Sequence, residues 1–567
     1  MRFLTEPLRL PRLRPYVPGP DDPAIFWFNS ERDDIVREVV RRVVDKNAQE
    51  GASLEYALNE VAYHETRRLE GQRDEEARQE LGQWRGLLRR VARMSDEAKR
   101  DALESIARRM AEDIAGNFDP RVYRFASRAA PQLLTGVMRP SALPRDLASG
   151  SNGSHRVDEL LRVTGPVEHL KALEARGTMV YVPTHSSNLD SVALGYALYR
   201  EGLAPVVYGA GKNLFTNPII SFFMHNLGAY RVDRRVRALL YKDTLKTYST
   251  VMIERGYHSL FFPGGTRSRS GMIERRLKLG LAGTAIEAFA RNQVYGIRRP
   301  VFFVPTTINY GLVMEAETLI EDHLQEQGKA RYIIEDDEFS SFERWLAFFR
   351  KILATEGACV INFGSPIDPF GNPVDEEGRS LAPSGREIDP GTYVLDRGRA
   401  TLDEKRDAAY TRELGELLLS IYRRETVVMN ENLIAHVIFR RLVRETPGVD
   451  LFGRLRIRGD IQVPREQLVE EIGRTRDRAL ALVDEGRLHV GPGVAEHPPL
   501  TLMTGAFTTW DGYHTRCLAR NAGPDVVIED PTLLLYYQNR LLDFAEDLAP
   551  EAEHAAAREI AQMGGPA

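Results

Sequence analysis

Two residues five positions apart, His185 and Asp190, are of types suited to proton transfer. They follow a short apolar segment, 179–183, that is typical of a β-strand, and a helix is expected to begin near residue 188. His185 would then lie at the strand's end and Asp190 in the first helical turn, where the side chains can meet. A carboxylate fixes the tautomer of a histidine and stabilises the imidazolium formed when it takes a proton from an alcohol. The alternative is a loop histidine beside an aspartate that caps the helix.

Three further blocks of sequence follow this pair in order. They are residues 209–215 with 228–235, residues 261–271, and residues 304–311. Each block joins an apolar strand-like segment to glycine, arginine or small polar residues. Glycine lets a ligand approach the backbone closely, and arginine offers a planar fork of donors that matches phosphate oxygens. The blocks therefore predict a phosphate site at a row of strand ends.

The four blocks, in this order, resemble motifs I to IV of the glycerolipid acyltransferase family, most closely its long bacterial glycerol-3-phosphate acyltransferase branch. The resemblance covers roughly residues 155–365, with weaker similarity at 360–366 and 533–540. It implies acyl transfer from an acyl thioester, acyl-CoA or acyl carrier protein, to the sn-1 hydroxyl of glycerol 3-phosphate. The product would be lysophosphatidate, for phospholipid biosynthesis. The thioester is a co-substrate, and no cofactor is expected.

The resemblance also implies roles for individual residues. His185 is expected to act as the general base and Asp190 to orient its imidazole. Arg234 and Arg267 match the motif II and motif III arginines that hold the phosphate. The further candidates for substrate binding are Lys212, Asn213, Arg231, Gly265, Ser268 and Arg269. The flanking cations at 235, 237, 275, 276 and 278 are expected to form a solvated basic face or a docking surface for anionic lipid or acyl carrier protein.

Two departures from the family pattern leave the acceptor open. Gly264 stands where motif III normally has a glutamate, and Asp233 replaces the first arginine of the usual pair. The lost carboxylate would otherwise accept hydrogen bonds from the polyol or fix an arginine. One alternative function is therefore acylation of lysophosphatidate or another phosphorylated polyol. Another, of a different class, is a catalytically idle relative that binds lipid or a partner.

Other residues that could act as nucleophiles or metal ligands stand in less suitable places. Ser186 and Ser187 adjoin the histidine, where capping or turn hydrogen bonds are the simpler role. Cys359 and Cys517 lie outside the four blocks and are expected to pack in the protein interior. The histidines lack the paired spacing of a zinc site, so no metal is expected. These scattered histidines are His155, His169, His225 and His258.

Composition favours a large intracellular protein. The chain has 567 residues, 43% of them apolar, with a net charge of −5 that favours no binding to nucleic acid. Its two cysteines provide no disulfide framework. With neither a secretory signal nor a transmembrane run, the expected place is the cytoplasm, peripherally at the inner face of the membrane. The apolar and basic segment 214–237 could touch lipid, although a buried core helix would look similar.

The elements expected to position the motifs alternate between strands and helices. Strand-like runs at 179–183, 205–208, 259–263, 301–309 and 358–363 are separated by helical segments. This alternation predicts an α/β fold with a layered core and a largely parallel sheet, flanked by N- and C-terminal helical regions. The predicted parts are an N-terminal helical region (1–150), the acyltransferase catalytic domain (151–366), a surface excursion or linker (367–400) and a C-terminal helical region (401–567).

Overall fold

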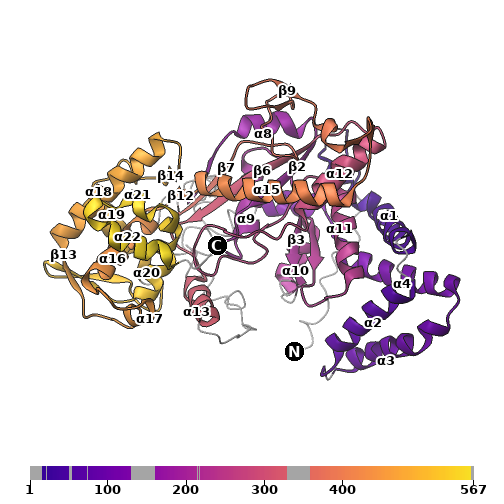
Figure 1. The fold of residues 1–567 in the computed structure, drawn as a ribbon, viewed down its shortest axis with the longest axis horizontal. Coiled ribbons are helices and arrows are strands. Elements are labelled where there is room, and N and C mark those ends of the chain that lie inside the picture. Colours follow the sequence, from indigo (N-terminus) through magenta and orange to yellow (C-terminus); the bar gives the residue numbers. More distant parts are fainter. Residues whose placement is uncertain are drawn as a thin grey trace, which may run out of the picture.

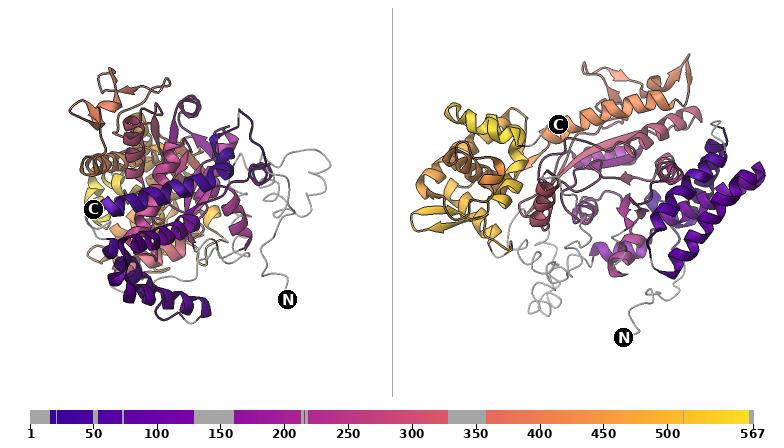
Figure 2. Two further views of the ribbon diagram at one scale, coloured as in Figure 1. Left: turned by 90° about the vertical axis from the view of Figure 1, so that its right-hand side faces the viewer. Right: turned by 60° about the horizontal axis from the view of Figure 1, so that its bottom comes forward.

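A seven-stranded sheet forms the centre of the molecule, between a helical N-terminal region and a C-terminal region (Figure 1). The two further views in Figure 2 show the same three parts, with helices on both faces of the sheet. The computed structural model describes residues 16–20, 22–49, 54–72, 74–128, 160–212, 215, 218–327, 358–511 and 513–563.

The central sheet is mixed but mostly parallel. In spatial order its strands are β1 (Leu161–Thr164), β7 (Cys359–Phe363), β6 (Val301–Tyr310), β2 (Thr178–Pro183), β5 (Ser259–Leu260), β3 (Val207–Gly211) and β4 (Ala229–Val232). The five strands from β6 to β4 are parallel, whereas β7 is antiparallel to β6 and pairs in parallel with β1. The predicted α/β class with a largely parallel sheet is therefore confirmed.

The expected strands differ from the observed ones mainly at the edges and next to the motifs. The run 259–263 was expected to be one strand, but β5 has only two residues, because the chain turns at Pro263 into the glycine-rich loop. β3 begins at Val207 rather than at residue 205. β1 and β4 were not expected. They are short edge strands that carry Arg162 and Arg231, and such strands lack the continuous apolar run of central ones.

Side chains that alternate along β2 bury both faces of the sheet. Met179 and Tyr181 belong to one apolar cluster, whereas Val180 and Val182 belong to another. The first cluster includes residues of α8 (Val167–Glu174) and α9 (Asp190–Arg200), and the second includes residues of α11 (Leu239–Glu254), α12 (Ala282–Val294) and α15 (Glu404–Arg424). The sheet is thus the middle layer of three, and loops at its strand ends can approach one another.

The N-terminal region packs against α11, one of the helices that cover the central sheet. Its helices are α1 (Phe28–Gln49), α2 (Leu54–Leu69), α3 (Glu75–Arg90) and α4 (Asp96–Ile114). On α1, Ile35, Val39 and Val43 are fully buried, at the spacing of one helical face. They share an apolar cluster with Tyr248 and Val251 of α11.

The excursion after β7 contains short pieces of regular structure. These are the hairpin of β8 (Ser380–Leu381) and β9 (Glu387–Ile388), the 3-10 helix η5 (Pro390–Val394), and the hairpin of β10 (Leu395–Asp396) and β11 (Arg399–Ala400). Many of its side chains are exposed, but Val394 is fully buried and Phe370 stacks on Tyr393 with ring centres 4.5 Å apart. The segment is therefore fastened to the core. The predicted boundaries of the four parts stay predictions.

The C-terminal region is built around one helix, α16 (Asn430–Glu445), whose residues are buried on nearly every side of the helix. Around it lie α17 (Leu451–Arg454), α18 (Arg465–Asp484), α19 (Pro499–Trp510), α20 (Pro531–Gln538), the 3-10 helix η6 (Asn539–Phe544), α21 (Ala545–Leu548) and α22 (His554–Gln562). The sequence predicted helices here, but the region also has an antiparallel sheet of β13 (Gln462–Pro464), β16 (Asp525–Ile528) and β15 (Ala519–Ala522). These strands are three or four residues long, too short to give a recognisable alternation.

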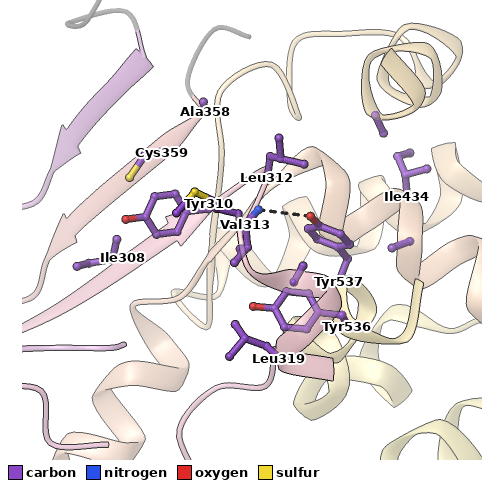
Figure 3. Close-up of a cluster of buried hydrophobic side chains, with 14 of the residues drawn as sticks. Ile308, Tyr310, Leu312, Val313, Leu319, Ala358, Cys359, Ile434, Tyr536 and Tyr537 are labelled. Atoms are coloured by element: carbon purple, nitrogen blue, oxygen red, sulfur yellow. Dashed lines mark hydrogen bonds between the residues drawn. The ribbon is translucent and has the colours of Figure 1, made fainter. Parts of the chain in front are cut away.

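The C-terminal region and the sheet meet in a continuous apolar contact. Figure 3 shows Tyr536 and Tyr537 of α20 beside the connection between β6 and α13 (Ala316–Gln327). The hydroxyl of Tyr537 accepts a hydrogen bond from the backbone N–H of Val313 at 3.3 Å. Gly271 has a φ of +78°, and a Cβ there would lie 2.1 Å from the carbonyl oxygen of Tyr536. The loop after β5 is thus pressed against α20, and only glycine fits this approach.

Within the described ranges, no helix combines the length and apolarity needed to cross a bilayer. The helix α10 (Pro218–Asn226) lies in the segment 214–237, for which the sequence allows either contact with lipid or a position in the core. Its described side chains from residue 221 to 226 are half-buried, a burial that fits either alternative. Contact with a membrane therefore stays a prediction.

Candidate active site

His185 and Asp190 meet in the loop between β2 and α9. The imidazole Nδ1 lies 2.8 Å from Asp190 Oδ2, and Asp190 is the first residue of α9, as the spacing predicted. Because a carboxylate can only accept, Nδ1 carries the proton in this pair and Nε2 holds the lone pair. The described residues provide no hydrogen-bond partner for Nε2. The pair thus has the arrangement of a general base and its orienting acid.

The carboxylate of Asp190 is fixed by the backbone of its own loop. Its Oδ2 also accepts hydrogen bonds from the N–H groups of Ser186 at 2.6 Å and Ser187 at 3.0 Å. Asp190 is completely buried, and it stands at the N-terminus of α9, where the helix dipole favours negative charge. These contacts fix the carboxylate before any substrate arrives.

The loop after β5, which contains motif III, holds the histidine itself. The His185 ring stacks on Phe262, with ring centres 4.1 Å apart and an angle of 24°. Its backbone carbonyl accepts from the N–H of Ser268 at 2.7 Å, and its backbone N–H donates to Glu274 Oε1 at 2.8 Å. Ring, carbonyl and amide are thus positioned by three residues of one neighbouring loop.

A buried glutamate, Glu315, links the motif I loop to Arg267. Its carboxylate accepts from the hydroxyl of Ser187 at 2.9 Å and from the N–H of Asn188 at 3.0 Å. It also accepts from Arg267 Nη1 at 3.2 Å, and it is only 1% exposed. Arg267 therefore lies beside the histidine loop, where the resemblance expects a phosphate contact.

Basic side chains line a hollow of about 430 Å³ at the motif III loop. Its lining includes Arg267, Arg269 and Lys278. Gly265 has a φ of +73°, and a Cβ there would come within 2.4 Å of Lys278 Cδ, so the lysine lies directly over this glycine. Desolvation, followed by the charges of Arg234 and Arg269, lowers the pKa of Lys278. Lys278 was expected on a solvated basic face or on a docking surface for anionic lipid or acyl carrier protein. It lies with Arg267 and Arg269 on the lining of this hollow, a group called here the cation cluster, and its role stays a prediction.

Arg234 is exposed on the loop after β4, and no described residue forms an ion pair with it. Its neighbour Asp233 instead binds Arg235, at 2.8 Å between Oδ2 and Nη2. Desolvation, followed by the charge of Arg267, lowers the pKa of Arg234. Arg234 lines a second hollow, of about 640 Å³, between this loop and α2. Each of the two arginines thus lines a hollow, and an anion bound close to both would relieve the repulsion between them.

The other sequence candidates are engaged by acidic or backbone groups. Lys212 Nζ lies 2.9 Å and Arg231 Nη1 lies 3.5 Å from the carboxylate of Asp113 in α4. Arg269 pairs with Glu326. The hydroxyl of Ser268 donates to the carbonyl of Met272 at 2.9 Å, and Asn213 lies outside the described residues.

The serines and cysteines are not arranged as nucleophiles. The hydroxyl of Ser187 is bonded to Glu315, and that of Ser186 accepts from Arg540 Nη2 at 3.1 Å. Burial raises the pKa of the Cys359 thiol and, more moderately, that of Cys517, which keeps both protonated. In the described part of the chain, no cluster of three or more acidic, histidine or cysteine side chains could hold a metal ion.

Three residues of the site were missed by the sequence analysis. Glu315 follows motif IV by four residues, Glu274 follows Arg267 by seven, and Arg540 comes from η6 in the C-terminal region. The only signal for Arg540 was the similarity of residues 533–540 to the long bacterial branch. No spacing rule points to any of the three, because the fold brings them to the histidine.

Comparison with known proteins points to the same family as the sequence motifs. Residues 165–309 match the family model described as Acyltransferase. Curated relatives named glycerol-3-phosphate acyltransferase include proteins of Aeromonas hydrophila, Xylella fastidiosa and Pseudomonas aeruginosa. The first is 33% identical over 209 residues, covering 36% of this chain and 24% of the relative. The second is 31% identical over 207 residues (35% and 22%), and the third 29% over 278 residues (48% and 28%).

The matched segment, together with the site at the strand ends, therefore identifies an acyltransferase domain. That domain is similar to the glycerolipid acyltransferases and is close to their glycerol-3-phosphate acyltransferase branch. The chain spans about a quarter of the length of the curated relatives it matches.

Proposed function

We propose that this protein transfers an acyl group from an acyl thioester to the sn-1 hydroxyl of glycerol 3-phosphate, giving lysophosphatidate. The observation that carries the proposal is the His185–Asp190 pair, joined through Glu315 to a cluster of cations. A base for the hydroxyl and positive charge for the phosphate are the two requirements of this acceptor.

The reaction can be followed through the base. His185 Nε2 takes the proton of the acceptor hydroxyl while that oxygen attacks the thioester carbonyl carbon. The C–S bond then breaks, the imidazolium returns the proton to the departing thiolate, and an ester and a free thiol result. Asp190 holds the imidazole through Nδ1 during both transfers, so that neither proton movement requires the ring to turn.

The donor and the membrane belong to the same proposal. The donor is acyl-CoA or acyl carrier protein, both of which are anionic and suit the basic residues around the two hollows. Because lysophosphatidate is amphiphilic, the protein is proposed to act peripherally at the inner face of the membrane. Increased sedimentation with anionic vesicles over neutral ones would support this surface, and equal recovery in the supernatant with both would oppose it.

The test is an acyl transfer assay with purified protein, radiolabelled glycerol 3-phosphate and palmitoyl-CoA or palmitoyl acyl carrier protein. Labelled lysophosphatidate is expected, with the acyl chain on the sn-1 oxygen by NMR. His185→Ala should lower kcat by about 100- to 10,000-fold, the usual contribution of a general base. Transfer only to lysophosphatidate or another phosphorylated polyol would replace the acceptor, whereas folded protein that acylates no such acceptor would favour an idle relative.

A further inference from the structure

The side chain of Glu274 occupies the space in front of Gly264. A Cβ placed on Gly264 would lie 3.4 Å from Glu274 Cγ and 3.8 Å from its Oε1. The family pattern expects a glutamate at position 264, so a carboxylate ten residues further along the chain fills the region that this glutamate would enter. Two glutamate side chains would compete for that region.

Glu274 makes a specific contact with the proposed base. Its Oε1 accepts the backbone N–H of His185 at 2.8 Å, and it is the described partner of that N–H. The other contacts of the histidine are made by Asp190 at Nδ1, Phe262 at the ring and Ser268 at the carbonyl. Glu274 therefore controls the point at which the chain enters the histidine loop from β2.

The surroundings of Glu274 are unusual for a merely structural carboxylate. Its Oε2 is buried and has no hydrogen-bond partner among the residues that the structure describes. Burial raises the pKa of Glu274, and the charge of Arg540 opposes this shift. Arg540 is 8% exposed and binds the hydroxyl of Ser186, the residue next to the histidine. Glu274 also lines the basic hollow, and a buried carboxylate with an unpartnered oxygen in such a place is a candidate for a role in the site.

We propose that Glu274 is a positioning residue of this acyltransferase site, and that its carboxylate fixes the backbone of His185 from the space a glutamate at position 264 would use. The inference rests on the proposed function, because it concerns the base of that reaction. It also explains why position 264 can be a glycine: the carboxylate in this space is supplied by Glu274 instead.

The experiment moves the carboxylate between the two positions. Glu274→Ala should lower kcat by about 100-fold, as expected for a base displaced by about 1 Å, with little change in KM for glycerol 3-phosphate. Glu274→Gln should keep most activity, because an amide oxygen still accepts from the His185 N–H. Gly264→Glu should also lose activity through crowding. The double variant Gly264→Glu/Glu274→Ala should recover at least about tenfold over either single variant, a non-additivity that marks a shared space.

Gly264→Ala is the matched control. Its methyl group would make only close van der Waals contacts, and position 264 has no positive φ, so near-native kcat is expected. Thermal melts identify any variant that fails to fold. If Glu274→Ala is one, the comparison of Glu274→Gln with Gly264→Glu and the double variant decides. Native kcat in Glu274→Ala, or a double variant no better than Gly264→Glu, would overturn the inference.

A second measurement separates this inference from the proposed function. Modification of His185 by diethyl pyrocarbonate, followed by mass spectrometry, reports the position of the ring without any turnover. Loosening the loop should speed modification in Glu274→Ala but not in Gly264→Ala, since the His185 side chain is only 15% exposed. If the wild type transfers no acyl group, the proposed function fails, and an unchanged modification rate would independently overturn the role of Glu274.

Discussion

The loops after β2 and β4 differ in whether their charged side chains have partners within the protein. In the first, Asp190 is fully buried and held by two backbone amides, and His185 is fixed at its ring, amide and carbonyl. In the second, Arg234 is exposed, without a described ion pair, and repelled by Arg267. The first loop is organised before the substrate arrives, whereas in the second loop the Arg234 guanidinium remains available to pair with an anionic ligand.

Under the proposed function, the first loop would carry out the reaction and the second would bind the acceptor. A base works best when its geometry is fixed in advance, because no reorganisation is then needed during the reaction. A cation that must bind an anionic ligand should instead lack an internal partner, because a satisfied charge gains little from the ligand. Arg267 lies between the two cases, since it belongs to the cation cluster but is bonded to buried Glu315.

The largest expected effect comes from Asp190→Asn. The amide would keep the size of the side chain but present an N–H to the imidazole and favour the wrong tautomer. We expect kcat to fall by about 10,000-fold, the scale of this change in other histidine–aspartate pairs, with the fold intact. Steady-state kinetics and a thermal melt check this. A fall below tenfold would mean that the first loop is less organised for catalysis than its contacts indicate.

Arg267→Met should impair both stability and activity. It leaves Glu315 buried without its cation, at a cost of about 3 kcal/mol in the free energy of unfolding, and it removes a proposed phosphate contact. Denaturant unfolding and KM for glycerol 3-phosphate are the measurements. The double variant Arg267→Met/Glu315→Gln should regain stability but not KM. Recovery of both would assign Arg267 to the fold alone.

Arg234→Ala should raise KM by about 10- to 100-fold, the value of one charge-assisted hydrogen bond, without changing stability. The matched control is Arg235→Ala, which removes an equal charge that is already paired with Asp233. We expect the control to change KM much less. Equal effects of the two variants would mean that only the summed charge of the loop matters, and the contrast between paired and unpaired cations would be lost.

The smallest expected effect concerns the acid stability that buried His258, beside β2, contributes. Burial lowers the pKa of His258 to about 4, and its Nδ1 accepts from the N–H of Met179 in β2 at 3.1 Å. The stability it contributes is complete above the unfolded pKa of about 6.5 and is lost as the pH falls toward 4. Relative to His258→Asn, the wild type should therefore lose up to about 1.4 kcal/mol per pH unit in that window.

Glu174, near His258 Nε2 at 3.7 Å, is the control for this measurement. Burial raises its pKa to about 7, so its contribution is present below 4.5 and is lost as the pH rises through 7, opposite in sign to that of the histidine. Repeating the comparison in a Glu174→Gln background removes this opposing change. Parallel pH profiles for the two proteins that differ only at His258 would contradict the prediction.

The sequence was sufficient for features that local patterns encode. The apolar run of β2, followed by His185 and a helix expected to begin near residue 188, predicted that the pair could meet, and the observed helix begins at Asp190. The alternation of strand-like and helical segments predicted the largely parallel sheet. The arginine edge strands β1 and β4 were missed, because a short strand with a charged residue has no distinctive pattern. The roles of the individual site residues stay predictions.

The sequence was insufficient where distant segments converge. Glu315 is 128 positions from Ser187, and Arg540 is 354 positions from Ser186, yet each bonds the serine hydroxyl. Gly264 looked like a lost carboxylate, and only the fold shows that Glu274 fills the adjoining space. Such contacts depend on how the loops fold over one another, which spacing along one segment does not specify.

The close approach of α20 and η6 to the motif III loop determines which segments must be exchanged together in a chimeric protein. Arg540 reaches Ser186, Asn539 Nδ2 donates to the Ser270 carbonyl at 2.8 Å, and Gly271 abuts Tyr536. A chimera that exchanged only residues 165–309 would pack a foreign motif III loop against the surface of α20 and η6, which is complementary to the native loop. Any graft of the catalytic segment must therefore carry residues 531–544 with it.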